Sequence, residues 1–494
     1  MILDVLVYII VILYILAALF VLLHSLFDLH LILHYLLSHT KKKVVESRSN
    51  YSPFVTIQLP VYNELHVVER LLDAAAGIDY PADKIEIQVL DDSTDETSEL
   101  IARKILSLHL QPISILHIRR QNREGFKAGA LKHGLNSARG EFLAIFDADF
   151  LPSKDFLKRT IPFFLDEAIG MVQTNWGHIN KKACLLTKLQ ALALDGHFSI
   201  EQQGRNAAGY FINFNGTAGV WRKHTILDAG NWQADTLTED FDLSYRAQMK
   251  GWKFKYLEDC VTPAELPALI TSLKSQQFRW TKGGAETARK NLKKLIYSPL
   301  PFSVKLHGVF HLIYSFGFIS IIIYTVLSVP LIFVKEFYPQ FSEVFAFAGI
   351  VGYSLFIYIL HYFISWFNTT TGSIAKRVFG FMIHFPLFVS LFIGISLSNA
   401  IGIMQGYLGI KSGFVRTPKF NSINPANRLK SRYAEANINW LTLLEGILIF
   451  YFLFGSIQAF YFKNYITIPL LLIAFTGFSM VFWLSIIERK MQVK

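Results

Sequence analysis

The sequence predicts an α/β domain, with a doubly wound and mostly parallel sheet, inserted between transmembrane α-helices. Three observations support this fold class. Apolar residues concentrate in residues 1–38 and after about residue 302, whereas the segment between them has the composition of a soluble domain. In that segment, short apolar strands alternate with helical patterns, which is typical of parallel sheets. Two of the strands end in acidic residues, at the edge where such sheets bind ligands.

Composition and charge narrow the class of protein. Of the 494 residues, 52% are hydrophobic and 17% charged, compared with about 25% charged in soluble domains. A net charge of +11 would suggest nucleic acid as the partner of a soluble protein. Here the cations flank apolar segments, so we attribute them to the positive-inside rule and expect no nucleic-acid partner. Cys184 and Cys260 define neither a disulfide framework nor a metal site.

Residues 1–40 are predicted to form an N-terminal transmembrane helix. Residues 4–37 make one apolar stretch that is long enough to span a bilayer. The stretch is too long for a cleavable signal peptide, and no basic segment precedes it. Asp28, His30 and His34 lie near its end, where we expect them to reach the membrane interface. Residues 41–51 are a polar linker.

The predicted soluble domain covers residues 52–300. Hydrophobic patterning predicts strands at residues 54–59, 85–90, 113–118 and 142–146, and helices at 64–76, 95–108 and 126–138. The second strand ends in Asp91-Asp92, and the fourth ends in Asp147-Ala148-Asp149. Because parallel strands end at the same edge of a sheet, both acidic groups are expected to face one ligand site.

Residues 301–494 are predicted to contain about four transmembrane spans, which we expect at 309–334, 342–366, 439–462 and 467–487. Residues 379–408 are also apolar. If they crossed the membrane, the loop 411–432, which contains six Lys and Arg residues, would lie on the opposite side from the soluble domain. The positive-inside rule therefore favours an interfacial helix at 379–408 and a cytosolic soluble domain.

The acidic strand ends suggest a metal and a nucleotide. Asp147 and Asp149 offer hard oxygen ligands, which suit Mg²⁺ or Mn²⁺ held jointly with the phosphates of a substrate. Asp91 and Asp92 could accept hydrogen bonds from the base and ribose of a nucleotide. Alternatively, they serve only the turn that leads into the next helix.

The run Thr238-Glu239-Asp240 begins a predicted helix. An acidic first turn capped by a threonine is ordinary helix chemistry, because carboxylates there complement the helix dipole. The functional alternative makes Asp240 a catalytic base.

Two further segments could contact a diphosphate. Lys127 opens a helix in a glycine-containing segment and could counter phosphate charge, although neither GxxxxGK[ST] nor GxGxxG occurs in the chain. Gln276 and Arg279 share a helix face, and arginine binds diphosphates through two nitrogens. Trp280 offers a flat apolar surface to a sugar ring. The alternative is an interfacial Arg/Trp pair beside the membrane.

In this order, the motifs DDS (Asp91–Ser93), DAD (Asp147–Asp149), TED (Thr238–Asp240) and QQFRW (Gln276–Trp280) resemble those of the family 2 inverting glycosyltransferases of the cellulose synthase superfamily. The segments FNGTAGVWRK, GFKAGAL, DLSYRAQMKGWKFKYLED and AELP look most like the cellulose-synthase-like A and C group and its bacterial relatives. Those enzymes make β-1,4-mannan or glucomannan, and β-1,4-glucan backbones. The resemblance covers about residues 50–300, and the membrane region by its layout.

The resemblance implies a GT-A fold and a role for each motif. It assigns nucleotide-sugar binding to Asp91, Asp92, Lys127, Asp147, Gln276, Arg279, Thr417 and Lys419, binding of Mg²⁺ or Mn²⁺ to Asp147 and Asp149, and acceptor binding to Trp280, Glu239, Phe214, Gly216 and Thr217. Asp240 would be the general base. The loop FVRTPK at residues 414–419 is similar to the family's gating loop FxVTxK, but has Arg416 where valine is usual.

The resemblance therefore predicts a membrane-embedded, processive, inverting glycosyltransferase. It would transfer a hexose from UDP-glucose or GDP-mannose to a growing β-1,4-glycan, in the bacterial plasma membrane or, in a eukaryote, the Golgi membrane. A non-processive enzyme that glycosylates a lipid acceptor is the alternative within the same class. A transporter or receptor with a regulatory soluble domain is the alternative from another class. The sequence specifies neither the donor sugar nor an export partner.

Overall fold

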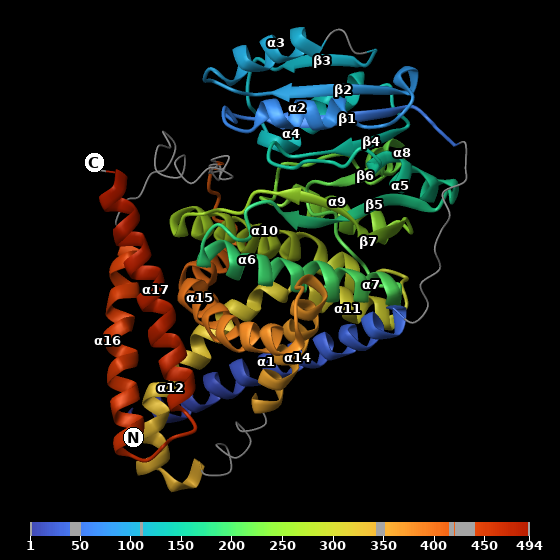
Figure 1. Cartoon of the computed structure of the whole chain (residues 1–494). Helices are drawn as coiled ribbons and strands as arrows, with labels where there is room; N and C mark the ends of the chain where they lie inside the picture. Colours follow the sequence, from blue (N-terminus) through green and yellow to red (C-terminus); the bar gives the residue numbers. More distant parts are fainter. Residues whose placement is uncertain are drawn as a thin grey trace.

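The computed structural model describes residues 2–39, 51–108, 112–341, 351–413, 419 and 440–492. Most of the predicted gating-like loop, including Thr417, lies outside these residues. The molecule has two parts (Figure 1). One end contains a sheet with its helices, and the other end contains long helices.

A seven-stranded sheet forms the first part, in the order β3-β2-β1-β4-β6-β5-β7. Its strands are β1 (Val55–Val61), β2 (Ile85–Asp91), β3 (Ser114–Arg119), β4 (Phe142–Ile145), β5 (Ile169–His178), β6 (Gly219–Arg222) and β7 (Lys253–Ala264). Strand β6 runs antiparallel to β4 and β5, and the other neighbouring strands are parallel. The predicted mostly parallel sheet is confirmed, and the four predicted strands correspond to β1–β4.

Helices cover both faces of the sheet, because its central strands are apolar on both sides. In β4, Phe142 and Ala144 face one core while Leu143 and Ile145 face the other. The helices of this part are α2 (Val68–Ala76), η1 (Ala82–Lys84), α3 (Thr97–Leu108), α4 (Phe126–Ser137), α5 (Phe156–Thr160), η2 (Ile161–Leu165), α6 (Leu185–Gly196), η3 (His197–Gln202), α7 (Gln203–Ala208), α8 (Lys223–Asp228) and α9 (Glu239–Met249). Helices α2 and α3 pack on the first core, and α4, α8 and α9 on the second.

Two local predictions differ from the structure. Helix α2 begins at Val68 rather than at residue 64, because Asn63 has a left-handed φ of 55° and a turn follows it. Thr238 occupies the N-cap position of α9, but its side chain makes no capping hydrogen bond. Its hydroxyl instead lies 3.2 Å from that of Thr287, so Thr238 joins α9 to the helix behind it.

The remaining helices are α1 (Ile2–His39), α10 (Ile270–Ile296), α11 (Phe302–Leu312), η4 (Tyr314–Phe316), α12 (Gly317–Phe337), η5 (Pro339–Phe341), α14 (Val351–Thr369), α15 (Ile374–Leu408), α16 (Trp440–Tyr461) and α17 (Ile468–Gln492). Helix α10 lies between the sheet and the long helices (Figure 1). It packs against α9, α11, α15 and α17, so it is one of the helices that connect the two parts.

Five of the described helical segments are long and apolar enough to cross a membrane: residues 2–38, 314–337, 374–408, 440–461 and 468–490. This finding supports a membrane protein. The third segment includes residues 379–408, for which the sequence predicts an interfacial helix. Length and composition do not decide between a spanning and an interfacial position, so that assignment stays a prediction, as do the domain boundaries.

Candidate active site

The acidic strand ends and the TED motif line one cavity of about 220 Å³ at the carboxyl edge of the sheet. The register pairs Val61 with Asp91, so β1 and β2 end together, and β4 ends beside them. Of the residues that the sequence predicts for the site, the cavity is lined by Asp92, Lys127, Asp147, Asp149, Gly216, Glu239, Asp240, Gln276, Arg279, Trp280 and Lys419. They come from segments that are far apart in the sequence, and the fold gathers them.

Three predicted residues do not line this cavity. Asp91 is buried, and its carboxylate accepts hydrogen bonds from Ser98, His117 and the backbone amide of Ser93. Burial alone would raise the pKa of Asp91, but these hydrogen bonds outweigh it and lower the pKa to about 2. Asp91 is thus engaged by the protein itself, which fits the structural alternative better than direct contact with a nucleotide.

Phe214 and Thr217 also lie behind the cavity wall. Phe214 is fully buried and packs edge-on against Trp221 in the core. The hydroxyl of Thr217 accepts a hydrogen bond of 2.9 Å from the backbone amide of Asp147. These two side chains are therefore not placed to contact an acceptor directly. Thr217 instead orients the DAD turn.

Each carboxylate of the DAD motif is paired with a lysine. Lys127 Nζ lies 2.5 Å from Asp147 Oδ1 and donates to the carbonyl of Gly216. Lys419 Nζ lies 2.7 Å from Asp149 Oδ2. Burial would lower the pKa of Lys127, but Asp147 and Glu239 outweigh it and raise the pKa. The two carboxylates are hard oxygen ligands, and each already pairs with the positive charge of a lysine at the cavity wall. They therefore fit a divalent cation.

Asp240 is held beside two charged neighbours. Burial, and then the negative charge of Glu239, raise the pKa of Asp240 to about 7, against the opposing effect of Lys127. Its Oδ1 accepts a hydrogen bond of 2.9 Å from the amide of Phe241. Burial likewise raises the pKa of Glu239. At neutral pH Asp240 is therefore poised between its protonated and ionised forms.

Gly216 approaches this carboxylate closely. Its φ is +82°, and an added Cβ would lie 2.8 Å from Asp240 Oδ2. Both facts favour glycine at this position, because an L side chain would be strained and would displace the carboxylate.

Helix α10 brings Gln276, Arg279 and Trp280 to the same cavity. Burial lowers the pKa of Arg279 to about 10, while Glu239 and Asp147 oppose that shift. The guanidinium of Arg279 therefore stays charged at neutral pH, and it lies within the electrostatic influence of Asp147 and Glu239. Such a site can take a diphosphate between Arg279 and a cation.

A second cavity, of about 320 Å³, continues from the first towards the long helices. The two share Trp176, Asn215, Asp240, Gln276 and Trp280 among their lining residues. The second cavity mixes aromatic with polar side chains, a combination suited to the faces and hydroxyls of sugars.

A third cavity, of about 280 Å³, follows among α1, α12, α14 and α15 and is mostly apolar. It shares Tyr314, Phe318, Tyr362 and Phe392 with the second. Asp240 thus stands where the first cavity meets a path towards the helices.

Several lining residues were not identified from the sequence: Tyr62, Glu64, Arg123, Trp176, His178, Asn215 and Glu265. The guanidinium of Arg123 lies 3.3 Å from the centre of the Tyr62 ring. Tyr62 and Glu64 directly follow β1, and His178 ends β5. The rule that ligands bind beyond strand ends would have found these three.

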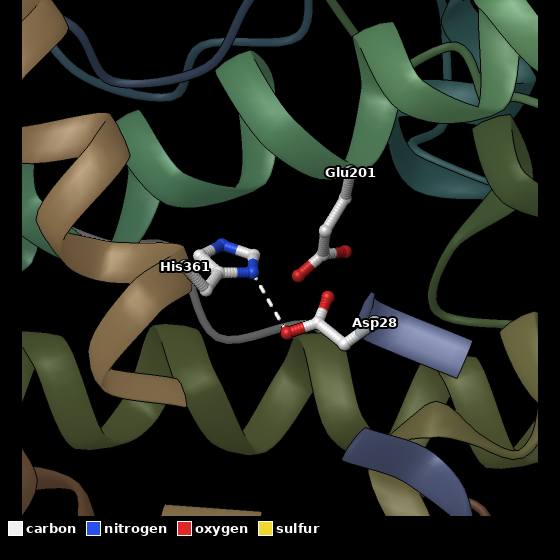
Figure 2. A group of neighbouring side chains, drawn as sticks. All are labelled: Asp28, Glu201 and His361. Atoms are coloured by element: carbon white, nitrogen blue, oxygen red, sulfur yellow. Dashed lines mark hydrogen bonds and ion pairs between the residues drawn. The ribbon is translucent and has the colours of Figure 1, made fainter. Parts of the chain in front are cut away.

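A buried cluster outside the cavity joins three elements (Figure 2): Asp28 of α1, Glu201 of η3 and His361 of α14 point towards one another. Their ligand atoms lie within 4.8 Å of each other, close enough to hold an ion. Glu201, however, already pairs with Arg205 at 3.3 Å, and Asp28 with His361 at 2.7 Å. These three side chains already contact partners within the protein, and we assign the cluster a role in fastening α1 and α14 to the part that contains the sheet. Asp28 is buried there and does not reach the membrane interface as predicted.

Comparison with known families points to a sugar-transferring class of protein. Residues 53–283 match the sequence model described as "Glycosyltransferase like family 2". The matched residues contain the sheet and most of the residues that line the first cavity.

Curated relatives are glucomannan 4-beta-mannosyltransferases. The chain is 41% identical over 289 residues to glucomannan 4-beta-mannosyltransferase 7 of Arabidopsis thaliana, which covers 58% of this chain and 51% of the relative. It is 41% identical over 294 residues to glucomannan 4-beta-mannosyltransferase 1 of Cyamopsis tetragonoloba, with 58% and 55% covered. The chain spans about half the length of the curated relatives it matches.

Among solved structures, the mannosyltransferase PcManGT from Pyrobaculum calidifontis, in complex with GDP-Man and Mn²⁺, is similar with a TM-score of 0.51. It is 20% identical and covers 71% of this chain and 98% of its own. At this identity the similarity bears on the fold, and it agrees with the predicted GT-A architecture.

Proposed function

We propose that the protein is a membrane-embedded, inverting β-glycan synthase that extends a β-1,4-linked chain from a nucleotide sugar. The observation that carries the proposal is the position of Asp240. It lies between a cavity with a diphosphate-binding set of charges and a second cavity suited to a glycan. The names of the curated relatives favour a mannosyl donor such as GDP-mannose, with UDP-glucose as the other candidate.

In the proposed reaction, Asp240 accepts the proton of the acceptor hydroxyl as that oxygen attacks the anomeric carbon. Arg279 and Gln276 bind the diphosphate, and Trp280 packs against the terminal sugar of the acceptor. Asp147 and Asp149 would hold Mg²⁺ or Mn²⁺, which neutralises the leaving diphosphate when bound. A single displacement with one base and no covalent nucleophile inverts the anomeric centre, so an α-linked donor gives a β-glycoside.

We further propose that the glycan leaves through the second and third cavities among α1, α12, α14 and α15. The catalytic part and the basic loops would face the cytosol of a bacterium, or of a eukaryotic cell if the membrane is that of the Golgi. The apolar third cavity also suits a lipid tail, which keeps a lipid acceptor as the second candidate.

The product of the purified, full-length protein tests this proposal. We expect radiolabel from GDP-mannose or UDP-glucose to enter a polymer that a β-1,4-mannanase or β-1,4-glucanase digests. A single sugar on a solvent-extractable lipid would refute the processive enzyme and support the lipid acceptor. Absence of transfer from every donor in a panel would refute the proposed function.

The pH profile should report the Asp240–Glu239 pair. Because only the ionised form of Asp240 accepts a proton, kcat/KM should rise through a pH of about 7 and level off above it. Glu239→Gln removes the nearby negative charge that raises the pKa of Asp240, so the rising limb should move to lower pH. Rate measurements from pH 5 to 9 check this, and an unmoved limb in the variant would contradict the assignment.

Gly216→Ala should disable the enzyme. The new methyl group would displace the Asp240 carboxylate, and a misplaced base costs about a hundredfold in rate. Gly251→Ala is the matched control, because Gly251 has a φ of +97° but open space around it. Both variants should lose stability through left-handed strain of about 1–2 kcal/mol, whereas only Gly216→Ala should lose activity. Equal activities would show that crowding at Gly216 does not matter.

A further inference from the structure

The first turn of α10 takes its cap from a residue far along the chain. Leu269, at the N-cap position, offers no side-chain acceptor. Instead, the carboxylate of Glu488 in α17 accepts from the amide of Ile270 at 2.5 Å, and from the amide and hydroxyl of Thr271 at 3.1 and 2.8 Å. Glu488 is 218 residues away in sequence from Ile270. Its negative charge also complements the dipole of α10.

A second contact follows in the next turn of α10. Lys274 Nζ donates to Glu445 Oε1 of α16 at 2.6 Å, and the side chain of Glu445 is fully buried. A buried ion pair contributes little net stability, since apolar residues of similar size often serve as well. Such a pair instead fixes how α10 and α16 are oriented, because its hydrogen-bond geometry permits one arrangement of the two helices.

A third helix closes on α10 from the side. An added Cβ at Gly406 of α15 would lie 2.6 Å from the carbonyl oxygen of Lys282, and one at Gly402 would lie 3.2 Å from that of Phe278. The backbones of α15 and α10 are therefore in close contact around Arg279 and Trp280, which leaves α10 little room to slide.

From these contacts we propose that Glu445 and Glu488 are positioning residues, through which the last two membrane helices set the place of Arg279 and Trp280 in the cavity. Arg279 lies eight residues after Thr271 on one continuous helix, about 12 Å along its axis. Anchoring the first turn therefore fixes the guanidinium relative to the DAD carboxylates. This inference rests on the proposed function, since it takes Arg279 to bind the donor diphosphate.

Exchange of the ion pair tests the proposal in the full-length protein, reconstituted in lipid nanodiscs. Glu445→Lys places two cations together and should weaken binding of GDP or UDP, and raise the donor KM, by about tenfold. The double variant Lys274→Glu/Glu445→Lys restores a pair of opposite charges, so both quantities should return to near their wild-type values. Glu488→Gln keeps the shape and one acceptor oxygen, and should weaken nucleotide binding in the same direction.

Asp28→Asn is the control, because it removes the negative charge from a buried hydrogen-bonded pair with His361 that does not involve α10. It should lower thermal stability while nucleotide affinity and donor KM stay unchanged. The proposal is overturned if Glu445→Lys and Glu488→Gln, when folded, bind nucleotide as the wild type does, or if the folded double variant does not recover. Absence of sugar transfer by the wild type would instead refute the proposed function, and nucleotide binding would still report on the anchoring of α10.

Discussion

Asp240→Asn is expected to abolish glycan synthesis while leaving the fold intact. Asparagine has nearly the shape of aspartate but cannot accept the acceptor's proton, and loss of a general base costs roughly a hundredfold to ten-thousandfold in rate. Because the pKa of Asp240 is raised, the substitution also removes a carboxylate that was costly to keep ionised in the buried site. The variant should therefore be at least as stable to heat as the wild type. Initial rates and thermal unfolding of the purified protein measure the two effects.

Asp73→Asn is the matched control for that experiment. Asp73 is an exposed aspartate on α2 that pairs with Lys104 and does not line the cavity. The same substitution there should leave the rate unchanged. If Asp240→Asn retained more than about a tenth of the wild-type rate, it would contradict the role of Asp240 as base. It would also favour a transporter or receptor, in which this carboxylate has no chemical task.

Loss of a DAD carboxylate is expected to have the second-largest effect. Asp149→Asn should reduce the rate by about a hundredfold to a thousandfold. The substitution removes a ligand of the proposed metal ion, whose positive charge would stabilise the leaving diphosphate. The same variant should bind Mn²⁺ more weakly, which titration followed by electron paramagnetic resonance measures directly. Lys419 pairs with Asp149 in the structure, so this variant also loses that ion pair.

Asp155→Asn controls for the loss of one negative charge nearby. Asp155 follows the same strand but is exposed and lies outside the cavity, so its loss should change neither the rate nor Mn²⁺ binding. Wild-type Mn²⁺ binding by Asp149→Asn would show that the DAD motif does not hold the metal.

Much of the fold could be predicted because its signals are local. Strands β1, β2 and β4 are short apolar runs with turns after them. Almost all of their residues are buried, as expected for central strands of a parallel sheet. Strands β5, β6 and β7 were not predicted from the sequence. Strand β6 has four residues, and the pairing of β5 with β7 is irregular in two places. Their patterns were therefore too short or too interrupted to detect.

The gathering of three motifs in one candidate site could be predicted from the sequence. The DAD, TED and QQFRW motifs reach the same cavity, as their order along the chain suggested. Asp91 shows where this reasoning fails. A motif letter does not reveal whether a carboxylate faces a ligand or accepts hydrogen bonds from Ser98 and His117, because that depends on neighbours brought by the fold.

The contacts that cross between the two parts of the molecule could not be predicted. Glu488 and Ile270 are separated by 218 residues, and Asp28 and His361 by 333. Nothing in the local sequence of α17 marks Glu488 as the cap of α10. In the sequence alone it is one acidic residue beside the basic end of an apolar helix. Such pairs become visible only when the packing of the helices is known.

The stereochemistry of the product tests the central claim most directly. The purified protein should be given an α-linked nucleotide sugar and a short β-1,4-linked oligosaccharide acceptor, and the new linkage should be read by nuclear magnetic resonance. A single displacement assisted by Asp240 predicts a new β-linkage, formed by the wild type and absent with Asp240→Asn. An α-linkage would contradict the account, because retention of configuration requires a different mechanism from the one that this site supports.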